Sequence, residues 1–334
     1  MSFLQAKLFK VGKYASGPGA VVVIGQYMYV FGDFSRFVDE KPPTEPVEYK
    51  LLISDLTQLG YEIVDDASGD IPISRVGGAL AAIGDTVFLF GGRDATCNEL
   101  NDLYSFETST KIWTLLSSGD GPTERSYHLM KADDSHVYVF GGTGVNGQLN
   151  DLWVFDLNDN KWISYPDPPL EDSQESGSAY GLAVVNGKLW LVHGFPFGKK
   201  NVLCFDPIDE SWTQIETTMV ETPKPRILVS TDGVGQYVFV FGGLKEGEAE
   251  RPIGRENPGV VFALDAETNV WRRWDEDTYD GDYLPPSGHE YNLPGGNGLA
   301  GLIDNIGSDG IQILTPYYIK DEDEGEGEGE GKEE

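Results

Sequence analysis

The sequence predicts an all-β fold in which similar small sheets repeat along the chain, and three observations support this prediction. An apolar stretch that ends in a pair of glycines occurs several times. Each such stretch is followed by a second apolar stretch, a polar turn and an aromatic residue. The 334 residues also include 42 glycines and 19 prolines, which indicate many turns, while a hydrophobic content of 40% is enough for a sizeable core.

The glycine-pair motif marks one strand of each repeat. It occurs in full at 87–92 (VFLFGG), 137–142 (VYVFGG) and 238–243 (VFVFGG), and in weaker form at 29–33 and 190–194. Its first glycine stands at positions 32, 91, 141, 194 and 242, so the period is close to 50 residues. Alternating β-branched and aromatic residues suit strands buried between neighbouring sheets. A glycine pair lets the backbone turn or bulge where a side chain would collide.

A second predicted strand and a tryptophan follow each motif. The strands are expected at 103–107, 152–156, 202–206 and 261–265, ahead of Trp113, Trp162, Trp212 and Trp271. Residues 52–61 form a degenerate version that ends in tyrosine. An indole offers a large apolar surface to an adjacent sheet. Four short strands per unit of about 50 residues are typical of kelch repeats, so residues 1–319 are predicted to form a kelch β-propeller.

The number of blades and the closure of the ring follow from the ends of this region. Five units are recognisable, and the residues after Trp274 make up most of another that lacks one outer strand. Residues 6–11 (AKLFKV) resemble such a strand. We therefore expect six blades, with the N-terminal strand joining the last blade, because closure removes the open sheet edges that promote aggregation.

The end of the chain has a different composition. Residues 320–334 consist of Glu, Gly, Asp and Lys, with no apolar side chain to bury, so this acidic tail is predicted to be disordered. A solubilising role and a role in docking basic partners both remain open.

Charge and cysteine content restrict partners and location. The net charge of −31 opposes binding to nucleic acid and to anionic membrane surfaces, which need clustered Lys and Arg. Neither of the two cysteines, Cys97 and Cys204, belongs to a CxxC pair, which fits a reducing compartment. No secretory h-region and no bilayer-length apolar stretch is visible. These features predict a cytoplasmic or nucleocytoplasmic protein.

Arginine recurs at the start of the first strand of three units, as Arg75, Arg125 and Arg226. Equivalent positions of a propeller lie on one ring around its axis, so these guanidinium groups could form a site for a carboxylate or sulfate. The alternative is that each arginine pairs with a local acid or a loop carbonyl.

Other candidate ligand residues carry weaker signals. The four histidines, His128, His136, His193 and His289, show no metal-binding or triad spacing and are expected in the core or at its rim. The connection from glycine pair to tryptophan is longest in the fifth unit, through 244–258. Its Glu246, Glu248 and Glu250 could offer oxygen ligands to a hard cation, or could form a solvated charged loop.

The motifs resemble those of the plant glucosinolate specifier proteins, the epithiospecifier, nitrile-specifier and thiocyanate-forming kelch proteins. The similarity runs from Leu4 to Tyr318 and is sharpest between Arg75 and Trp162. The stretches that carry it are 100–106 (LNDLYSF), 113–120 (WTLLSSGD), 125–128 (RSYH), 149–153 (LNDLW), 262–268 (FALDAET) and 314–318 (LTPYY).

The resemblance implies Fe(II)-dependent conversion of the aglycone that a myrosinase-type glucosidase releases, with nitriles among the products. It also implies that Arg75 and Arg125 hold the sulfate of the aglycone. The family's Glu-x3-Asp-x3-His iron motif falls here on Glu246, Glu250 and Gly254, so two carboxylates remain and the imidazole is missing. Two functions stay open: a kelch module that binds a protein or small anionic ligand, and a specifier-type lyase. The incomplete iron motif favours the binding module.

Overall fold

The computed structural model describes residues 2–9, 20–33, 49–55, 62–170, 180–193, 202–219, 226–227, 230–241, 244–245, 261–274, 292–293, 300–302 and 311–318. Every regular element in these ranges is a β-strand. Within them, no helix has the length and apolar character needed to cross a bilayer. The predicted all-β propeller is therefore confirmed for this part of the chain.

Five sheets, called blades 1 to 5, are each built mainly from antiparallel strands that follow one another along the chain. Blade 1 contains β2 (Ala20–Ile24), β3 (Tyr27–Asp33), β4 (Tyr49–Asp55) and β5 (Glu62–Ile63). Blade 2 contains β7 (Ala79–Ile83), β8 (Thr86–Arg93), β9 (Glu99–Glu107) and β10 (Ile112–Ser117), with β6 (Ser68–Gly69) parallel to the outer side of β10. Blade 3 contains β11 (Leu129–Ala132), β12 (His136–Gly144), β13 (Gly147–Asp156) and β14 (Lys161–Tyr165).

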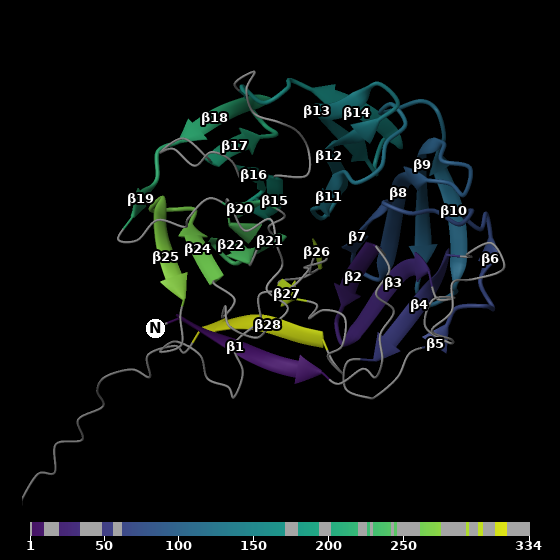
Figure 1. The fold of residues 1–334 in the computed structure, drawn as a ribbon, viewed down its shortest axis with the longest axis horizontal. Coiled ribbons are helices and arrows are strands. Elements are labelled where there is room, and N and C mark those ends of the chain that lie inside the picture. Colours follow the sequence, from purple (N-terminus) through teal and green to yellow (C-terminus); the bar gives the residue numbers. More distant parts are fainter. Residues whose placement is uncertain are drawn as a thin grey trace, which may run out of the picture.

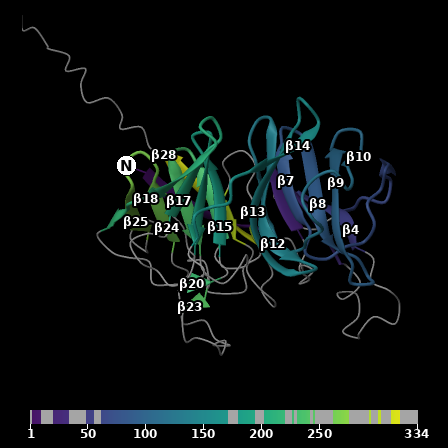
Figure 2. The same cartoon turned by 90° about the horizontal axis from the view of Figure 1, so that it is seen from above.

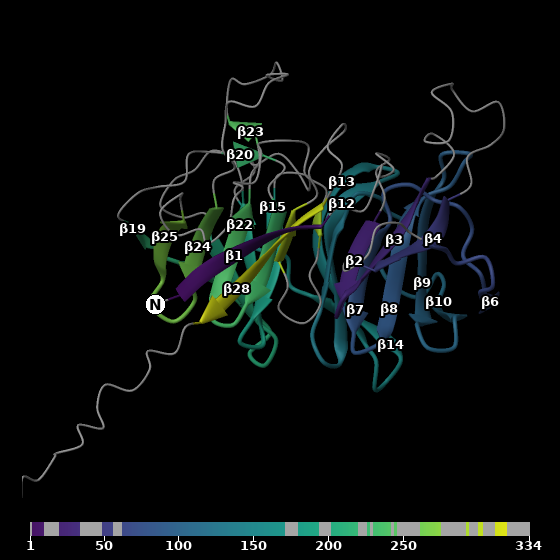
Figure 3. The same ribbon diagram turned by 90° about the horizontal axis from the view of Figure 1, so that it is seen from below.

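The remaining two blades have the same plan. Blade 4 contains β15 (Tyr180–Val185), β16 (Lys188–His193), β17 (Val202–Asp206) and β18 (Ser211–Ile215). Blade 5 contains β21 (Ser230–Val234), β22 (Tyr237–Phe241), β24 (Val261–Asp265) and β25 (Val270–Trp274), with β19 (Thr218–Met219) parallel to the outer side of β25. The short strands β20 (Arg226–Ile227) and β23 (Leu244–Lys245) pair with each other and stand out from one side of the ring (Figures 2 and 3).

A further sheet, the terminal sheet, combines the two ends of the chain. It contains β1 (Ser2–Phe9), β28 (Ile311–Tyr318), β27 (Ala300–Leu302) and β26 (Asn292–Leu293), in that order. The strand β1 pairs with β28 over all eight residues, from Ser2 opposite Tyr318 to Phe9 opposite Ile311. The sequence predicts six blades, whereas the structure has five that are built from consecutive strands. The terminal sheet differs because its outer strand comes from the opposite end of the chain.

The sheets are arranged around a centre (Figure 1). The innermost strands β2, β7, β11, β15 and β21 contact one another in that order, and β26 contacts both β21 and β2. Lys131 of β11 also reaches past blade 4, and its Nζ lies 3.1 Å from Oδ1 of Asp232 in β21. This ion pair joins the inner strands of blades 3 and 5.

The glycine pairs form β-bulges, as the sequence predicts. The β8–β9 register shifts between Phe90 and Gly92, and the β12–β13 register shifts between Phe140 and Gly142. Gly92 has a φ of 102° and Gly142 a φ of 96°, which favours glycine. A Cβ at Gly142 would lie only 2.7 Å from Cβ of His128, so only glycine fits against the segment that leads into β11.

The core lies between the blades, and each repeat tryptophan packs against the preceding blade. Trp113 belongs to the apolar cluster between blades 1 and 2, and Trp271 to the cluster between blades 4 and 5. Trp162 packs against the cluster between blades 2 and 3 and donates from Nε1 to Ser117 Oγ at 3.0 Å. The apolar surface of an indole explains why a tryptophan recurs at the four interfaces between consecutive blades from blade 1 to blade 5.

Candidate functional site

Arg75 occupies the entry to blade 2, immediately before the inner strand β7. Its side chain has no solvent exposure, and Nη1 and Nη2 donate to the two carboxylate oxygens of Asp102 in β9. Nη1 also donates to the carbonyl of Gly91, and Nε donates to the carbonyl of Ile73, both at 3.1 Å. The guanidinium thus fastens the entry segment to the middle strands of its own blade.

Arg125 repeats this arrangement in blade 3. Nη1 and Nη2 donate to Asp151 at 2.7 and 2.8 Å, and Nη1 donates to the carbonyl of Gly141 at 2.9 Å. Nε and Nη2 bind the carbonyl and hydroxyl of Thr123. Burial of Asp151 by itself would raise its pKa, but the hydrogen bonds and positive charge of Arg125 outweigh burial, so the pKa falls below its usual value.

These bonds are the ones expected from the second hypothesis for Arg75 and Arg125, in which each arginine pairs with a local acid or a loop carbonyl. A guanidinium has five N–H groups, and those of Arg125 are all directed at acceptors of its own blade. Arg226 occupies the equivalent strand start, and its backbone pairs with Lys245 in the β20–β23 ladder. Its side chain lies outside the described part of the structure, so its predicted anion-binding role stays a prediction.

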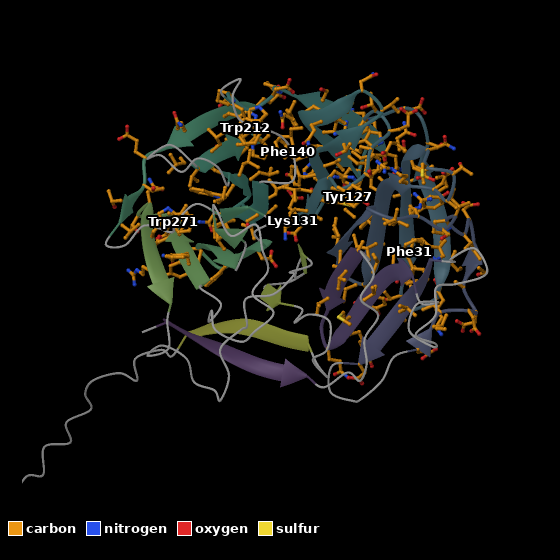
Figure 4. All side chains as sticks on the ribbon, viewed as in Figure 1. Phe31, Tyr127, Lys131, Phe140, Trp212 and Trp271 are labelled. Carbon is orange, nitrogen blue, oxygen red and sulfur yellow. The ribbon has the colours of Figure 1, made fainter. Side chains whose placement is uncertain are left out.

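The side of the ring that carries these arginines is called the loop-bearing face. It includes the connection at 94–98, which joins β8 to β9 within blade 2, and the connection at 145–146, which joins β12 to β13 within blade 3. An exposed tyrosine, Tyr127, lies on this face beside the centre of the ring (Figure 4). It stands two residues after Arg125, as Gly77 stands two residues after Arg75.

Tyr127 adopts a backbone conformation that is unusual for its residue type. Its φ is 55°, close to the 68° of Gly77, because both segments make the same bridge, Val76 to Arg93 and Ser126 to Thr143. This left-handed conformation costs a non-glycine residue about 1–2 kcal/mol. Tyr127 also donates its backbone N–H to the carbonyl of Gly77 at 2.7 Å, which links blades 2 and 3.

The Tyr127 ring is held in place by its surroundings. A Cβ at Gly77 would lie 3.0 Å from ring atom Cε1, so the ring rests on the glycine, while 48% of the residue remains exposed. The Arg93 guanidinium lies 6.0 Å from the ring centroid and is bound through Nε and Nη2 to Oε1 of Glu99. The other oxygen, Oε2, is buried and accepts no hydrogen bond from a described group. We name Tyr127, Arg93 and Glu99 the aromatic platform.

Sequence reasoning missed the aromatic platform, although one signal was available. Aligning the two repeats at their arginines places 75–78 (RVGG) over 125–128 (RSYH), so tyrosine stands where its neighbour has glycine. A bulky residue at a glycine position of a repeat indicates either strain or a specific contact.

His128 is buried at the interface of blades 2 and 3, where its ring makes an edge contact with Phe90 at 5.2 Å. Burial, reinforced by the charge of Arg125, lowers the pKa of His128 to about 3. The imidazole is therefore neutral near pH 7 and is packed as a core residue, in line with the sequence-based expectation. His193 at the end of β16 is described only in its backbone, and His289 lies outside the described residues.

Ser135, His136 and Asp133 meet at the β11–β12 turn, but they do not form a catalytic triad. Ser135 Oγ and Asp133 Oδ1 both lie beside Nδ1 of His136, at 3.1 and 3.0 Å. A triad needs the serine and the carboxylate on opposite ring nitrogens. Asp133 also accepts the hydroxyl of Tyr138 at 2.6 Å, so this cluster closes the turn.

The described residues contain no group of three or more His, Cys, Asp or Glu side chains that could hold a metal ion. Glu246, Glu248 and Glu250 lie outside the described residues, as does His289. The iron register at 246, 250 and 254 supplies two carboxylates and a glycine, and this donor set does not fit a protein-bound Fe(II) centre that requires an imidazole.

Comparisons with known proteins place this architecture among characterised relatives. The family model described as "KLHDC2/KLHL20/DRC7 Kelch-repeats domain" matches residues 18–243. The chain is 35% identical over 297 residues to N-(sulfonatooxy)prop-2-enimidothioate sulfolyase of Thlaspi arvense, with 80% of each chain covered. It is 30% identical over 214 residues to human Kelch domain-containing protein 3, covering 59% of this chain and 53% of the relative. The chain therefore spans most of the first relative and about half of the second.

Proposed function

This chain belongs to the kelch-repeat β-propeller family, and from that premise we propose that it is a binding module whose loop-bearing face takes a protein or a small anionic ligand. The observation that carries the proposal is the exposed tyrosine of the aromatic platform, held in a left-handed conformation where the neighbouring blade has glycine. Strained residues persist where the surrounding structure enforces them, and they cluster at binding sites.

The composition of the aromatic platform favours a protein partner. Tyrosine and arginine are enriched among the residues that dominate the energy of protein interfaces. The ring of Tyr127 is partly exposed and rests on Gly77, and a tyrosine has only two side-chain torsions, so little side-chain entropy is lost on binding. A partner N–H group that reached the buried Oε2 of Glu99 would satisfy an acceptor that has no described partner.

A small anion is the less favoured ligand on this face. The donors of Arg75 and Arg125 already bind Asp102 and Asp151, so an anion would have to displace a carboxylate from a buried pair. Arg226 takes no part in the bonds to Asp102 and Asp151, and it remains a predicted anion ligand.

The test compares two tyrosines of similar exposure. Tyr127→Ala removes the ring from the loop-bearing face. Tyr27→Ala removes a 42% exposed ring from the β2–β3 hairpin of blade 1, which lies on the face opposite the loop-bearing face. Proteins captured from a source extract by the purified chain are identified by mass spectrometry, and their affinities are then measured with purified components. A partner that binds the unchanged chain and Tyr27→Ala equally, but binds Tyr127→Ala at least about tenfold more weakly, supports the proposal. A partner insensitive to Tyr127 contradicts it.

A second candidate function is a specifier-type lyase, because identity to the Thlaspi sulfolyase extends over 80% of both chains. The substrate would be a sulfated thiohydroximate released by a myrosinase-type glucosidase, and Fe(II) is proposed as the cofactor by family resemblance alone. The assay combines the chain with myrosinase, allyl glucosinolate and Fe(II) under anaerobic conditions. Nitrile or thiocyanate products would establish this function, whereas isothiocyanate alone would leave the binding module.

The localisation that we propose is cytoplasmic. We also propose that the terminal sheet serves as the sixth blade of a closed ring. Support for the closed ring comes from the contacts of β26 with both β21 and β2, and from the pairing of β1 along β28.

A further inference from the structure

The short ladder of β20 and β23 places two basic residues opposite each other. In this antiparallel ladder Arg226 pairs with Lys245, and Ile227 pairs with Leu244. Directly opposed residues of an antiparallel pair lie on one face of the ladder, with Cβ atoms about 4.5–5.5 Å apart. The ladder stands out from one side of the ring (Figures 2 and 3). We name Arg226 and Lys245 the basic pair.

The repeat places the basic pair on the loop-bearing face. In blade 2, Val76 makes a bridge to Arg93. In blade 5, Ile227 and Leu244 make the corresponding pair. The first residue of each pair follows the strand-start arginine, and the second stands two residues after the first glycine of the glycine pair. The strand β23 therefore leaves blade 5 on the side where the 94–98 connection leaves blade 2.

The other blades with a strand-start arginine do not place a second cation beside it. The position of Lys245, one residue after the bridge, is Asp94 in blade 2 and Gly144 in blade 3. Like charges directly opposite each other in a ladder are destabilising, so the fold of a blade gives no reason for a lysine at this position. Lys and Arg make up only 24 of the 334 residues, against 55 acidic ones. Two opposed cations in so acidic a chain point to a ligand of negative charge.

The sequence of blade 5 also has no aspartate at the position that neutralises the other strand-start arginines. Asp151, the partner of Arg125, stands directly before the β13 residue that pairs with the phenylalanine ahead of the glycine pair. Asp102 has the same place in blade 2. In blade 5 this place belongs to Val260, directly before β24. A valine cannot accept a hydrogen bond, so the repeat does not supply Arg226 with the carboxylate that it supplies to Arg125.

The chemistry of the basic pair favours an oxyanion with two negative charges. A guanidinium group donates two parallel hydrogen bonds to a phosphate, and an ammonium group adds a point charge with three donors. A phosphate monoester carries close to two negative charges at pH 8, because its second pKa is about 6, whereas a sulfate monoester carries one. The net charge of −31 repels any anion, but at about 0.15 M salt the screening length is only about 8 Å, so the nearest charges dominate.

We propose that the basic pair binds a phosphate monoester on the loop-bearing face. This inference rests on the function proposed for that face, because it names the chemical class of the anionic ligand. A small phosphorylated molecule and a phosphorylated side chain of a partner both present this group, and the test distinguishes them.

The test compares phenyl phosphate with phenyl sulfate, which share one ring and differ by about one charge at pH 8. Each ester is titrated with the full chain at about 0.15 M salt, and its Kd is measured from the NMR signals of the phenyl protons. The unchanged chain is expected to bind phenyl phosphate at least about fivefold more tightly than phenyl sulfate.

Three variants locate the site. Arg226→Gln is expected to weaken the binding of phenyl phosphate at least about tenfold, and Lys245→Gln about fivefold. Lys161→Gln is the matched control, because it removes the same charge from a 57% exposed side chain at the outer edge of blade 3, and it should change the Kd less than about twofold. Lys245→Arg keeps both charges and is expected to bind within about threefold of the unchanged chain.

Equal Kd values for the two esters would overturn the proposal, and so would unchanged binding by Lys245→Gln. Equal losses for Lys245→Gln and Lys161→Gln would overturn it as well, because binding would then respond to net charge alone. Relief of like-charge repulsion should leave the melting temperature of Lys245→Gln equal to or above that of the unchanged chain. A clearly lower melting temperature would show that Lys245 is structural and would contradict the proposal.

Glycerol phosphate and a capped Gly-phosphoserine-Gly peptide distinguish the two sources of the phosphate group. Tighter binding of the peptide identifies a phosphorylated side chain, and equal or tighter binding of glycerol phosphate identifies a small ester. Both results support the basic pair if Arg226→Gln abolishes them. A partner that depends on Tyr127, together with no binding of phenyl phosphate, would refute this inference and leave the proposed function standing. Binding of phenyl phosphate without any partner that depends on Tyr127 would support the basic pair and refute the role of the aromatic platform.

Discussion

The bonds of single guanidinium nitrogens distinguish the two interpretations of Arg75 and Arg125, which are binding of an anionic ligand and pairing with a local acid. Each arginine stands at the start of a repeat, where a ring of guanidinium groups could face a ligand. The donors of Arg125 instead all reach acceptors within blade 3, with Asp151 as the charged partner. The choice depends on an aspartate in β13, 26 residues further along the chain.

We expect removal of the buried arginine to be strongly destabilising. Arg125→Ala leaves the carboxylate of Asp151 partly buried without its cation, and breaking such a pair typically costs about 3–5 kcal/mol of unfolding free energy. Lys161→Ala, which removes a pair with Asp159 in which both side chains are 57% exposed, should leave the free energy of unfolding nearly unchanged. Urea denaturation of both variants checks this expectation. A loss below about 1 kcal/mol for Arg125→Ala would show that the pair is not structural.

Tyr127 supplies a test of backbone strain. Glycine adopts the left-handed conformation without steric penalty, as Gly77 does in the preceding blade. Tyr127→Gly should therefore be more stable than Tyr127→Ala by about 1 kcal/mol, although glycine usually destabilises a folded chain relative to alanine. Chemical denaturation of the two variants measures the difference. If the alanine variant were the more stable one, the strain would be refuted.

His128 links stability to pH. Its pKa lies near 3 in the folded protein, well below the ordinary value of about 6.5, so the unfolded chain takes up a proton at higher pH than the folded one. The contribution of the neutral, buried imidazole to the free energy of unfolding is complete above about pH 6.5 and is lost as the pH falls from 6.5 toward 3. His128→Phe should flatten this part of the stability–pH curve, measured by denaturation between pH 4 and pH 7. An unchanged slope would contradict the burial of a neutral imidazole.

At the scale of elements, the sequence repeat identifies the strands that carry its motifs. The strands predicted at 103–107 and 152–156 lie within β9 and β13, and the glycine pairs form the expected bulges. The short outer strands β6 and β19 were not predicted. Each has two residues and pairs in parallel with an outer strand, so no alternation of side chains is long enough to reveal it.

The pairing of β1 with β28 is expected to hold the ring together. Deleting residues 2–9 would remove eight paired positions and leave β28 as an open edge. We expect the deletion to lower the melting temperature and to cause concentration-dependent association, measured by circular dichroism and size-exclusion chromatography. Deletion of 320–334 is the control, since the sequence predicts that this tail buries nothing. Equal melting temperatures for the two truncated chains would refute closure by β1.

At the scale of the whole molecule, the charge of −31 on 334 residues should make stability depend on salt. Like charges repel in the compact state, and raising the salt from about 0.01 M to 0.1 M shortens the screening length from about 30 Å to 10 Å. We expect the melting temperature to rise by about 1–2 °C, which corresponds to roughly 1 kcal/mol for a chain of 334 residues. Scanning calorimetry checks this, with an uncharged osmolyte as control for solvent effects. A fall with salt would show that favourable ion pairs dominate the field.

The sequence by itself determined the all-β repeat, the glycine bulges and the tryptophans between consecutive blades from blade 1 to blade 5, because each depends on residues that are contiguous or repeat at a constant spacing. Only the tertiary structure decided that Arg75 and Arg125 bind their own blades and that Tyr127 rests exposed on Gly77. The physical reason is that a side chain's partner is set by strand register and by the packing of neighbouring blades. These bring together residues that are distant in the chain, and no local pattern of side chains records which of them meet.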